Sequence, residues 1–464
     1  MTTYEDFLAS KALSDPMTGL KIIPPLPACL FPFQADIVRW ALRRGRAALF
    51  AGTGLGKSLM ELSWAQAVHQ STGRNVLLLT PLAVAAQMIR EAGKFGIVAR
   101  QASQQSEVLP GITVTNYQKL NRFDVASFGG IILDESSILK NETGATRNAL
   151  IQEVQSIPFR LAATATPAPN DFMELGSHAE FLSVMSYTDM LACFFTHDGS
   201  ETQKWRLKGH AETAFWKWMA SWGVMLRKPS DLGYEDGSFS LPPLVTHQHM
   251  VGVEYAPSME TGMLFPMQAE TLQERIRARR DTVSVRVAAA AALVNGNDRP
   301  WVCWGNLNAE TEAMTRAIPG AIEVRGSDPE DVKERRLDDF SQGKFRVLVT
   351  KGSIAGWGMN WQHCRDTVLV GMNDSWEMVF QIVRRFWRYG QTETVNAHFI
   401  ASEIEGAVVA NIRRKDADAD RMASAMVAQM ADLSSEQIHG QTRDRADYVP
   451  AKRLVLPSFL QKVS

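Results

Sequence analysis

A glycine-rich loop is the feature that most constrains the fold of this 464-residue chain. Residues 51–58 read AGTGLGKS and lie between the apolar residues 47–50 and residues 59–65, whose apolar positions repeat at helical spacing. A strand, a glycine loop and a helix in this order are the context that a phosphate-binding loop requires. Glycines let the backbone curl until successive N–H groups point at one anion, and the helix N-terminus adds partial positive charge. We therefore expect four loop residues to bind the phosphates of a nucleotide: Gly52, Thr53, Gly54 and Gly56.

Two polar side chains follow the glycines of this loop. Lys57 is placed to reach the β- and γ-phosphates of ATP, and the Ser58 hydroxyl is placed to ligate Mg²⁺. The alternative interpretation is a glycine turn before a helix with a chance Lys-Ser pair. The full motif in its strand–loop–helix context favours the nucleotide site.

An acidic pair is the second candidate centre. Asp134 and Glu135 end an apolar run at residues 131–133, and burying such a pair is costly unless a cation compensates. We expect Asp134 to share the Mg²⁺ with Ser58, and Glu135 to orient and deprotonate the attacking water as a catalytic residue. The alternative is an acidic turn at the end of a strand.

A glutamine near the start of a predicted helix precedes the loop. Gln34 offers both a donor and an acceptor, so its amide has the groups needed to pair with an adenine edge. Polarity at the start of a surface helix is the alternative reading. The position of Gln34 shortly before Lys57 favours pairing with adenine, and therefore ATP as the nucleotide.

Composition limits the class of protein. Hydrophobic residues make up 45% of the chain and charged residues 21%, as in an ordinary globular protein. The net charge of −1 means that any nucleic-acid surface is a local patch. The four cysteines form no CxxC pair, which argues against a disulfide framework or a zinc ribbon. The N-terminus does not resemble a leader, and we find no apolar run of about 18 residues. We therefore expect a cytoplasmic protein that does not enter a membrane.

Apolar strands alternate with helical segments in two separate regions, which predicts an α/β fold with two parallel sheets. The aromatic residues of the intervening helical segment are expected to pack in the core instead of stacking on bases. The expected organisation is an N-terminal arm (1–29), a first lobe (30–240) with an α-helical insertion (170–240), a second lobe (241–415) with a helical segment (266–294), and a C-terminal helix and tail (416–464).

The second lobe has no phosphate loop but contains two further motifs, GWGMN at residues 356–360 and QIVRRFWRYGQ at residues 381–391. On a helix, Gln381, Arg385 and Arg388 would share one face. They could form a surface patch, or they could contact the γ-phosphate of an ATP bound by the first lobe and act in catalysis. Three residues of the first motif are assigned to the nucleotide site: Gly356, Gly358 and Asn360.

Together these motifs resemble those of superfamily-two helicases, in the Swi/Snf-type DNA translocase branch. The resemblance also includes TPLAVAAQ at residues 80–87, TNYQ at 115–118, DESSILKN at 134–141 and TATP at 164–167, and it covers residues 30–415. More narrowly, the chain is similar to compact phage and prophage helicases of this branch. The features that carry this narrower likeness are Gln362, Glu405, Asn411 and Lys415.

This resemblance implies two RecA-like lobes that hydrolyse ATP in the cleft between them and track along duplex DNA as the cleft opens and closes. It also implies DNA contacts, for which the candidates are Pro81, Thr115, Asn116 and Lys351. The sequence departs from the branch at DESS and at residues 350–353, which read TKGS where chromatin remodellers have a Ser-Thr-Arg run. No chromatin-reading or nuclease module is visible, so histone remodelling is not expected. Because two lobes form one complete site, we expect a monomer, acting on duplex or branched DNA in a bacterial or phage-infected cell.

Two alternatives remain open at this point. An RNA helicase would use similar phosphate contacts, because these do not read base identity. A nucleotide-switched clamp would bind DNA with little ATP turnover, although the presence of Glu135, Arg385 and Arg388 argues against it.

Overall fold

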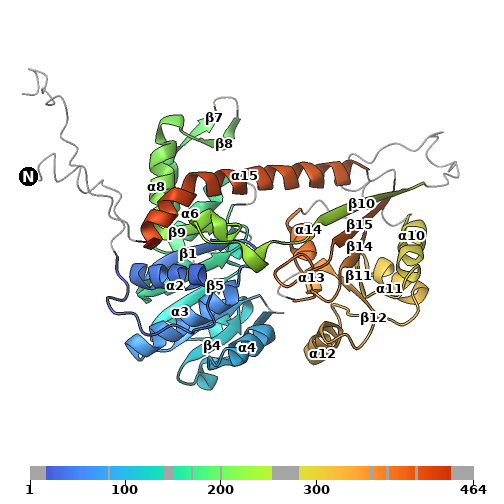
Figure 1. The fold of residues 1–464 in the computed structure, drawn as a ribbon, viewed down its shortest axis with the longest axis horizontal. Coiled ribbons are helices and arrows are strands. Elements are labelled where there is room, and N and C mark those ends of the chain that lie inside the picture. Colours follow the sequence, from blue (N-terminus) through green and yellow to red (C-terminus); the bar gives the residue numbers. More distant parts are fainter. Residues whose placement is uncertain are drawn as a thin grey trace, which may run out of the picture.

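The computed structural model describes residues 17–81, 84–140, 150–168, 171–198, 201–252, 282–355, 359–371, 376–402 and 406–439. The chain forms two lobes, each built around a parallel β-sheet covered by helices (Figure 1). The predicted α/β fold with two RecA-like lobes is therefore confirmed. None of the described helices is long and apolar enough to cross a membrane.

Lobe 1 contains a seven-stranded sheet of order β3-β4-β2-β5-β6-β1-β9, in which every neighbouring pair is parallel. Alternate side chains of β1 face opposite sides, so Phe50 packs in one core cluster and Leu49 in the other. Helices cover both faces, which explains why these strands are apolar throughout. The strands are β1 (Arg46–Ala51), β2 (Val76–Thr80), β3 (Ala99–Gln101), β4 (Ile112–Asn116), β5 (Gly130–Asp134), β6 (Phe159–Thr164) and β9 (Gly223–Leu226).

Helices α2 (Pro32–Arg44), α3 (Lys57–Thr72) and α4 (Ala85–Lys94) cover one face of this sheet. The other face is covered by the segment predicted as a helical insertion, which includes α6 (Leu175–Phe181), α7 (Tyr187–Phe194) and α8 (Glu212–Trp222). The aromatic side chains of α8, namely Phe215, Trp218 and Trp222, are buried in the core as predicted.

The insertion is not wholly helical. It also carries an antiparallel hairpin, β7 (Phe195–Asp198) with β8 (Glu201–Leu207), and it includes β9, which is an edge strand of the main sheet. The apolar run of β9 follows the aromatic helix directly. Periodicity alone does not separate a short buried strand from the end of a buried helix.

Lobe 2 contains a six-stranded parallel sheet of order β10-β15-β14-β11-β13-β12. Its strands are β10 (Leu244–Val251), β11 (Trp301–Gly305), β12 (Ala321–Glu323), β13 (Val347–Lys351), β14 (Asp366–Val370) and β15 (Val395–Ser402). Its helices are α10 (Val283–Asn295), α11 (Asn308–Ala317), α12 (Glu330–Ser341), α13 (Gly352–Ala355) and α14 (Trp376–Val383). Of the helical segment predicted at 266–294, residues 266–281 lie outside the described residues.

A C-terminal helix, α15 (Gly406–His439), runs from lobe 2 back to lobe 1 (Figure 1). It contacts β15 and α14 in lobe 2, and α2, α8 and β9 in lobe 1. Met426 and Met430 are buried in a core cluster of lobe 1, so this end of the helix packs on lobe 1.

Candidate nucleotide site between the lobes

The glycine-rich loop joins β1 to α3 and has the geometry of a phosphate cradle. Gly54 and Gly56 have φ angles of 89° and 78°, which are unfavourable for residues with a side chain. The loop is also crowded: a β-carbon at Gly56 would lie 2.3 Å from Gln34 Nε2. Lys57 begins α3, and its Nζ donates a hydrogen bond to the carbonyl oxygen of Ala51 at 2.9 Å.

Gln34 lies against this loop, as its position in the sequence suggested. Its Nε2 donates to the carbonyl oxygen of Leu55 at 2.9 Å, and its Oε1 accepts from the backbone N–H of Phe31 at 3.0 Å. The buried amide therefore joins the start of α2 to the phosphate loop. Its pairing with an adenine edge stays a prediction.

The acidic pair lies at the carboxyl end of β5. Asp134 is buried, and Glu135 has a φ of 52°, in the left-handed region. Such a conformation is strained in a residue with a side chain and is common at functional sites. Thr164 at the end of β6 donates a hydrogen bond from Oγ1 to Glu135 Oε2 at 3.3 Å. The strained backbone and this contact together orient the Glu135 carboxylate.

Burial and mutual charge set the electrostatics of this end of the sheet. Burial lowers the pKa of Lys57, and the charges of Glu135 and Asp134 oppose that shift. Burial, reinforced by Glu135, raises the pKa of Asp134 to about 7. Acidic groups therefore crowd around one partly buried lysine, an arrangement that a divalent cation would relieve.

Glu61 is a further member of this cluster that sequence reasoning missed. Burial, followed by the charge of Asp134, raises its pKa well above the usual range of a glutamate. Its side chain is fully buried, and neither carboxyl oxygen has a hydrogen-bond partner within the described part of the chain. The sequence offers only a weak signal, a carboxylate four residues after Lys57 and therefore on the same helix face.

These residues fit ATP and Mg²⁺. The glycine cradle leaves no room for side chains at Gly54 or Gly56, and oxygen ligands of the kind that Mg²⁺ prefers lie beside it. Ser58 and Asp134 are the residues that would hold the cation. Their assignment as metal ligands stays a prediction.

Lobe 2 contributes the predicted arginine motif. The expectation that Gln381, Arg385 and Arg388 share a helix is wrong, because α14 ends at Val383 and turns follow it. The three side chains nevertheless come together. Arg385 Nη2 donates to Gln381 Oε1 at 2.9 Å, and the Nη1 atoms of Arg385 and Arg388 donate to the Met359 carbonyl oxygen at 3.2 and 3.4 Å.

The two arginines face the acidic end of lobe 1. Burial lowers the pKa of Arg388, and the charges of Glu91 and Glu135 oppose that shift. Burial, reinforced by the charge of Arg388, lowers the pKa of Arg385 to about 10, while Glu135 and Asp134 oppose that shift. Arg388 also helps to lower the pKa of Lys57. Charges that are distant in sequence therefore act on one another in a single site between the lobes.

Further contacts join the lobes around this site. The Tyr389 ring lies 4.8 Å from the Phe239 ring and 6.4 Å from the Phe31 ring, between centroids. Away from these rings, Arg90 of α4 forms an ion pair with Asp338 of α12 at 3.5 Å.

The candidate nucleic-acid residues lie at strand ends. Pro81 follows β2, whereas Thr115 and Asn116 end β4 and are buried. Asn116 accepts a hydrogen bond from the backbone N–H of Lys119, so its side chain caps a turn. Lys351 ends β13. The DNA contacts of these residues stay predictions.

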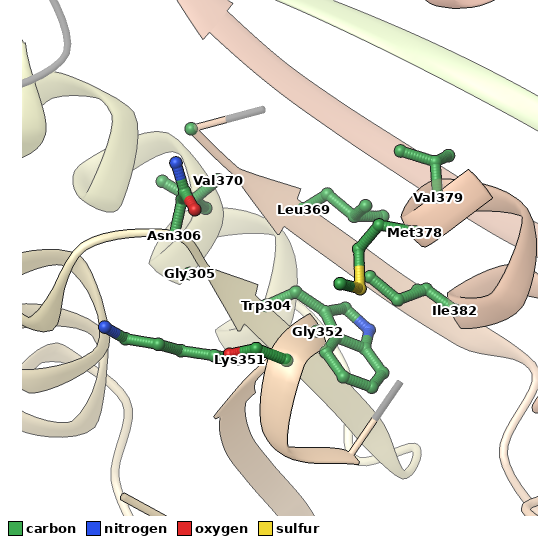
Figure 2. A pocket seen from close by; sticks show the side chains of 12 residues that line it. Trp304, Gly305, Asn306, Lys351, Gly352, Leu369, Val370, Met378, Val379 and Ile382 are labelled. Atoms are coloured by element: carbon green, nitrogen blue, oxygen red, sulfur yellow. The ribbon is translucent and has the colours of Figure 1, made fainter. Parts of the chain in front are cut away.

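Lys351 lines a cavity of about 80 Å³ in lobe 2. Figure 2 shows Lys351 and Asn306 on one side of this cavity and the apolar side chains of Met378 and Ile382 on the other. Two other residues of the nucleotide assignment, Gly356 and Gly358, lie outside the described residues. Asn360 is described, and its Oδ1 is buried without a hydrogen-bond partner among the described residues.

Two lobes with a phosphate loop on one and paired arginines on the other are the arrangement that the resemblance to superfamily-two, Swi/Snf-type ATPases implies. No protein-family model matches the chain. The chain is 22% identical over 453 residues to the DNA annealing helicase and endonuclease ZRANB3 of Mus musculus. This alignment covers 87% of this chain and 41% of that protein. The predicted resemblance to the Swi/Snf-type branch is thereby confirmed, whereas the narrower likeness to phage helicases stays a prediction. The chain spans about two fifths of the length of this relative.

Among solved structures, the chain matches the Sulfolobus solfataricus SWI2/SNF2 ATPase core in complex with dsDNA. The match has a TM-score of 0.41 and 17% sequence identity, and it covers 90% of this chain and 98% of that chain.

Proposed function

We propose that this protein is an ATP-dependent DNA translocase that hydrolyses ATP between its two lobes and moves on or remodels DNA. The observation that carries the proposal is the shared electrostatic site. Lys57, Asp134 and Glu135 of lobe 1 interact with Arg385 and Arg388 of lobe 2. A site divided between two lobes lets nucleotide binding and hydrolysis change the lobe arrangement, which is the requirement for a motor.

The roles of the residues follow from their chemistry. The loop amides and Lys57 bind the phosphates of ATP, and Mg²⁺ on Ser58 and Asp134 would neutralise charge on the β- and γ-phosphates. Glu135 orients the attacking water and accepts its proton. Arg385 and Arg388 stabilise the charge that develops on the transferred phosphoryl group, and Gln381 holds Arg385 for this role.

DNA is the proposed polymer because the sequence relative is a DNA annealing helicase. Lys351 on the rim of the lobe 2 cavity supplies a cation for a backbone phosphate. Action on forks or branched DNA is part of the proposal, as is function as a monomer, because one chain carries both halves of the site. RNA translocation is the second candidate, since phosphate contacts do not distinguish the bases.

The test compares ATP turnover with duplex DNA, single-stranded DNA, RNA and no polymer. Strongest stimulation by duplex DNA supports the proposal, and displacement of a third strand from a DNA triplex then tests movement directly. Stimulation by RNA alone would make the protein an RNA helicase. Tight DNA binding without turnover would make it a nucleotide-switched clamp, and an absence of both would reject the proposal.

A further inference from the structure

A buried ion pair lies inside lobe 2. Arg286 of α10 and Glu310 of α11 are both fully buried, with 2.7 Å between Arg286 Nη1 and Glu310 Oε1. Arg286 Nε also donates to Thr282 Oγ1 at 2.9 Å. Taking two charges out of water is costly, and apolar residues of similar size often stabilise such a position equally well or better. Stability alone therefore does not explain the pair.

The second carboxylate oxygen of Glu310 holds a loop. Glu310 Oε2 accepts hydrogen bonds from the backbone N–H groups of Asn306 at 2.7 Å and Leu307 at 2.9 Å. This loop joins β11 to α11. An apolar residue would accept neither bond, and an amide has only one acceptor oxygen for all three donors. Binding Arg286 and two loop amides at once therefore requires a carboxylate.

The same loop forms part of the rim of the lobe 2 cavity. Asn306 and Lys351 both line this cavity (Figure 2). Lys351 Nζ donates to Asn308 Oδ1 at 2.5 Å, and Asn308 is the first residue of α11. Glu310 thus fixes the backbone at Asn306 directly. Because Glu310 also lies in the first turn of α11, it fixes Asn308, the hydrogen-bond partner of Lys351.

The end of β14, which also lines the cavity, packs against this ion pair. Gly371 follows β14 and lines the cavity with a φ of +70°. A β-carbon there would lie 2.1 Å from Glu310 Oε1 and 2.6 Å from Arg286 Nη1. The glycine therefore lets the chain after β14 pass directly over the pair. The ends of β11 and β14 are both positioned against Arg286 and Glu310.

We propose that the Arg286–Glu310 pair is a positioning device for polymer binding, which holds Asn306 and Lys351 where they contact the phosphate backbone of nucleic acid. This inference rests on the proposed function. Lys351 supplies the positive charge and Asn306 an amide donor. Glu310 itself does not touch the polymer and acts through the loop, while Arg286 provides the buried counter-charge that keeps Glu310 in place.

The test is Glu310→Gln, assayed by DNA-stimulated ATP turnover. The DNA concentration for half-maximal stimulation is expected to rise about tenfold, the loss of one charge-assisted interaction. The maximal stimulated rate is expected to stay within about twofold, because the residues of the ATP site are unchanged. The slope of log affinity against log salt concentration is expected to fall by about one as Lys351 loses its contact.

The matched control is Asp339→Asn, which breaks an exposed ion pair with Lys344 in the same lobe. It is expected to change none of these quantities. A second variant, Arg286→Met with Glu310→Leu, replaces the pair by apolar side chains of similar size. It is expected to fold, because apolar packing compensates for the buried charges, and to lose DNA affinity as Glu310→Gln does, because neither loop amide keeps its acceptor.

Wild-type DNA affinity and salt dependence in the double variant would overturn the proposal, because the pair would then only contribute stability. Failure of both variants to fold would overturn it as well, since the pair would be required for the lobe itself. The proposed function fails separately, if the wild-type protein shows no stimulation by any nucleic acid. Clear wild-type stimulation with an unaltered Glu310→Gln variant rejects this inference alone.

Discussion

Tyr389 of lobe 2 contacts Gly54 of the phosphate loop so closely that a β-carbon at Gly54 would lie 2.6 Å from the Tyr389 backbone nitrogen. The two residues are far apart in sequence and belong to different lobes. Tyr389 immediately follows Arg388, so this contact brings the arginine motif to the phosphate loop. The position of the loop and that of the arginines are therefore mechanically linked.

Gly54→Ala tests this link. The added β-carbon is expected to push the lobes apart and to reduce ATP turnover at least about tenfold, because a small misplacement of catalytic groups is costly. The matched control is Gly73→Ala, where φ is +68° and no atom lies within 4 Å of the added carbon. Both variants carry backbone strain of about 1 kcal/mol. Equal turnover in the two variants would show that the contact with Tyr389 does not matter.

Glu135→Gln tests the assignment of the base. The amide cannot accept the proton of water, so we expect ATP and DNA binding to persist while DNA-stimulated turnover falls about 10²–10⁴-fold. Turnover is compared with that of Glu153→Gln, an exposed glutamate of the same lobe. If the Glu135→Gln rate stays within about threefold of wild type, another group is the base.

Met430→Ala tests the docking of α15 on lobe 1. Met430 is fully buried in a lobe 1 core cluster, so truncation is expected to lower the free energy of unfolding by about 2–5 kcal/mol. Met250→Ala is the control, because the Met250 side chain is 43% exposed. Urea unfolding of both variants gives the comparison. A Met430→Ala protein as stable as wild type would mean that α15 does not pack as described.

A stack of histidines predicts the acid sensitivity of lobe 2. His249 Nε2 and His398 Nδ1 lie 2.9 Å apart across β10 and β15. Burial, reinforced by His247, His249 and Arg299, lowers the pKa of His398 from its usual 6.5 to about 4. Between these values the unfolded chain binds a proton that the folded chain does not. Stability is therefore fully present above pH 6.5 and decreases as the pH falls towards 4.

Melting temperatures between pH 7 and pH 4.5, roughly the window over which a shifted histidine titrates, check this prediction. His398→Asn is expected to flatten the decrease with falling pH, whereas His210→Asn, at an exposed histidine, is expected to leave it unchanged. Identical pH profiles for wild type and His398→Asn would show that this histidine is not the titrating group.

Local signals in the sequence predicted the phosphate loop, the acidic pair and the two parallel sheets. Each depends on a short run of residues, such as the apolar strand that ends in Asp134. The end of α14 at Val383 was missed because tertiary contacts decide it: the carbonyl oxygen of Arg385, in the turns after α14, accepts a hydrogen bond from the backbone N–H of the distant Trp361 at 3.0 Å. Helical periodicity contains no information about such a turn.

Three other features of the site were not predicted, because they too depend on tertiary structure. Glu61 is conspicuous only when its burial and its missing hydrogen bonds are known. The contact between Tyr389 and Gly54 depends on how the two lobes pack. The left-handed φ of Glu135 is a strained conformation that residue type does not predict.

The most direct test of the shared site is DNA-stimulated ATP turnover by Arg388→Ala, beside Arg388→Lys and Arg385→Ala. An arginine that stabilises phosphoryl transfer is worth about 10³–10⁵ in rate, whereas a surface arginine is worth almost nothing. We expect Arg388→Ala to bind ATP nearly as wild type does but to lose at least about a hundredfold in rate, allowing for partial substitution by Arg385. Arg388→Lys is expected to be nearly as damaging, because a point charge cannot reproduce the planar fork. Loss of activity in Arg385→Ala alone would assign the role to Arg385, and wild-type turnover in all three variants would contradict a catalytic site completed by lobe 2.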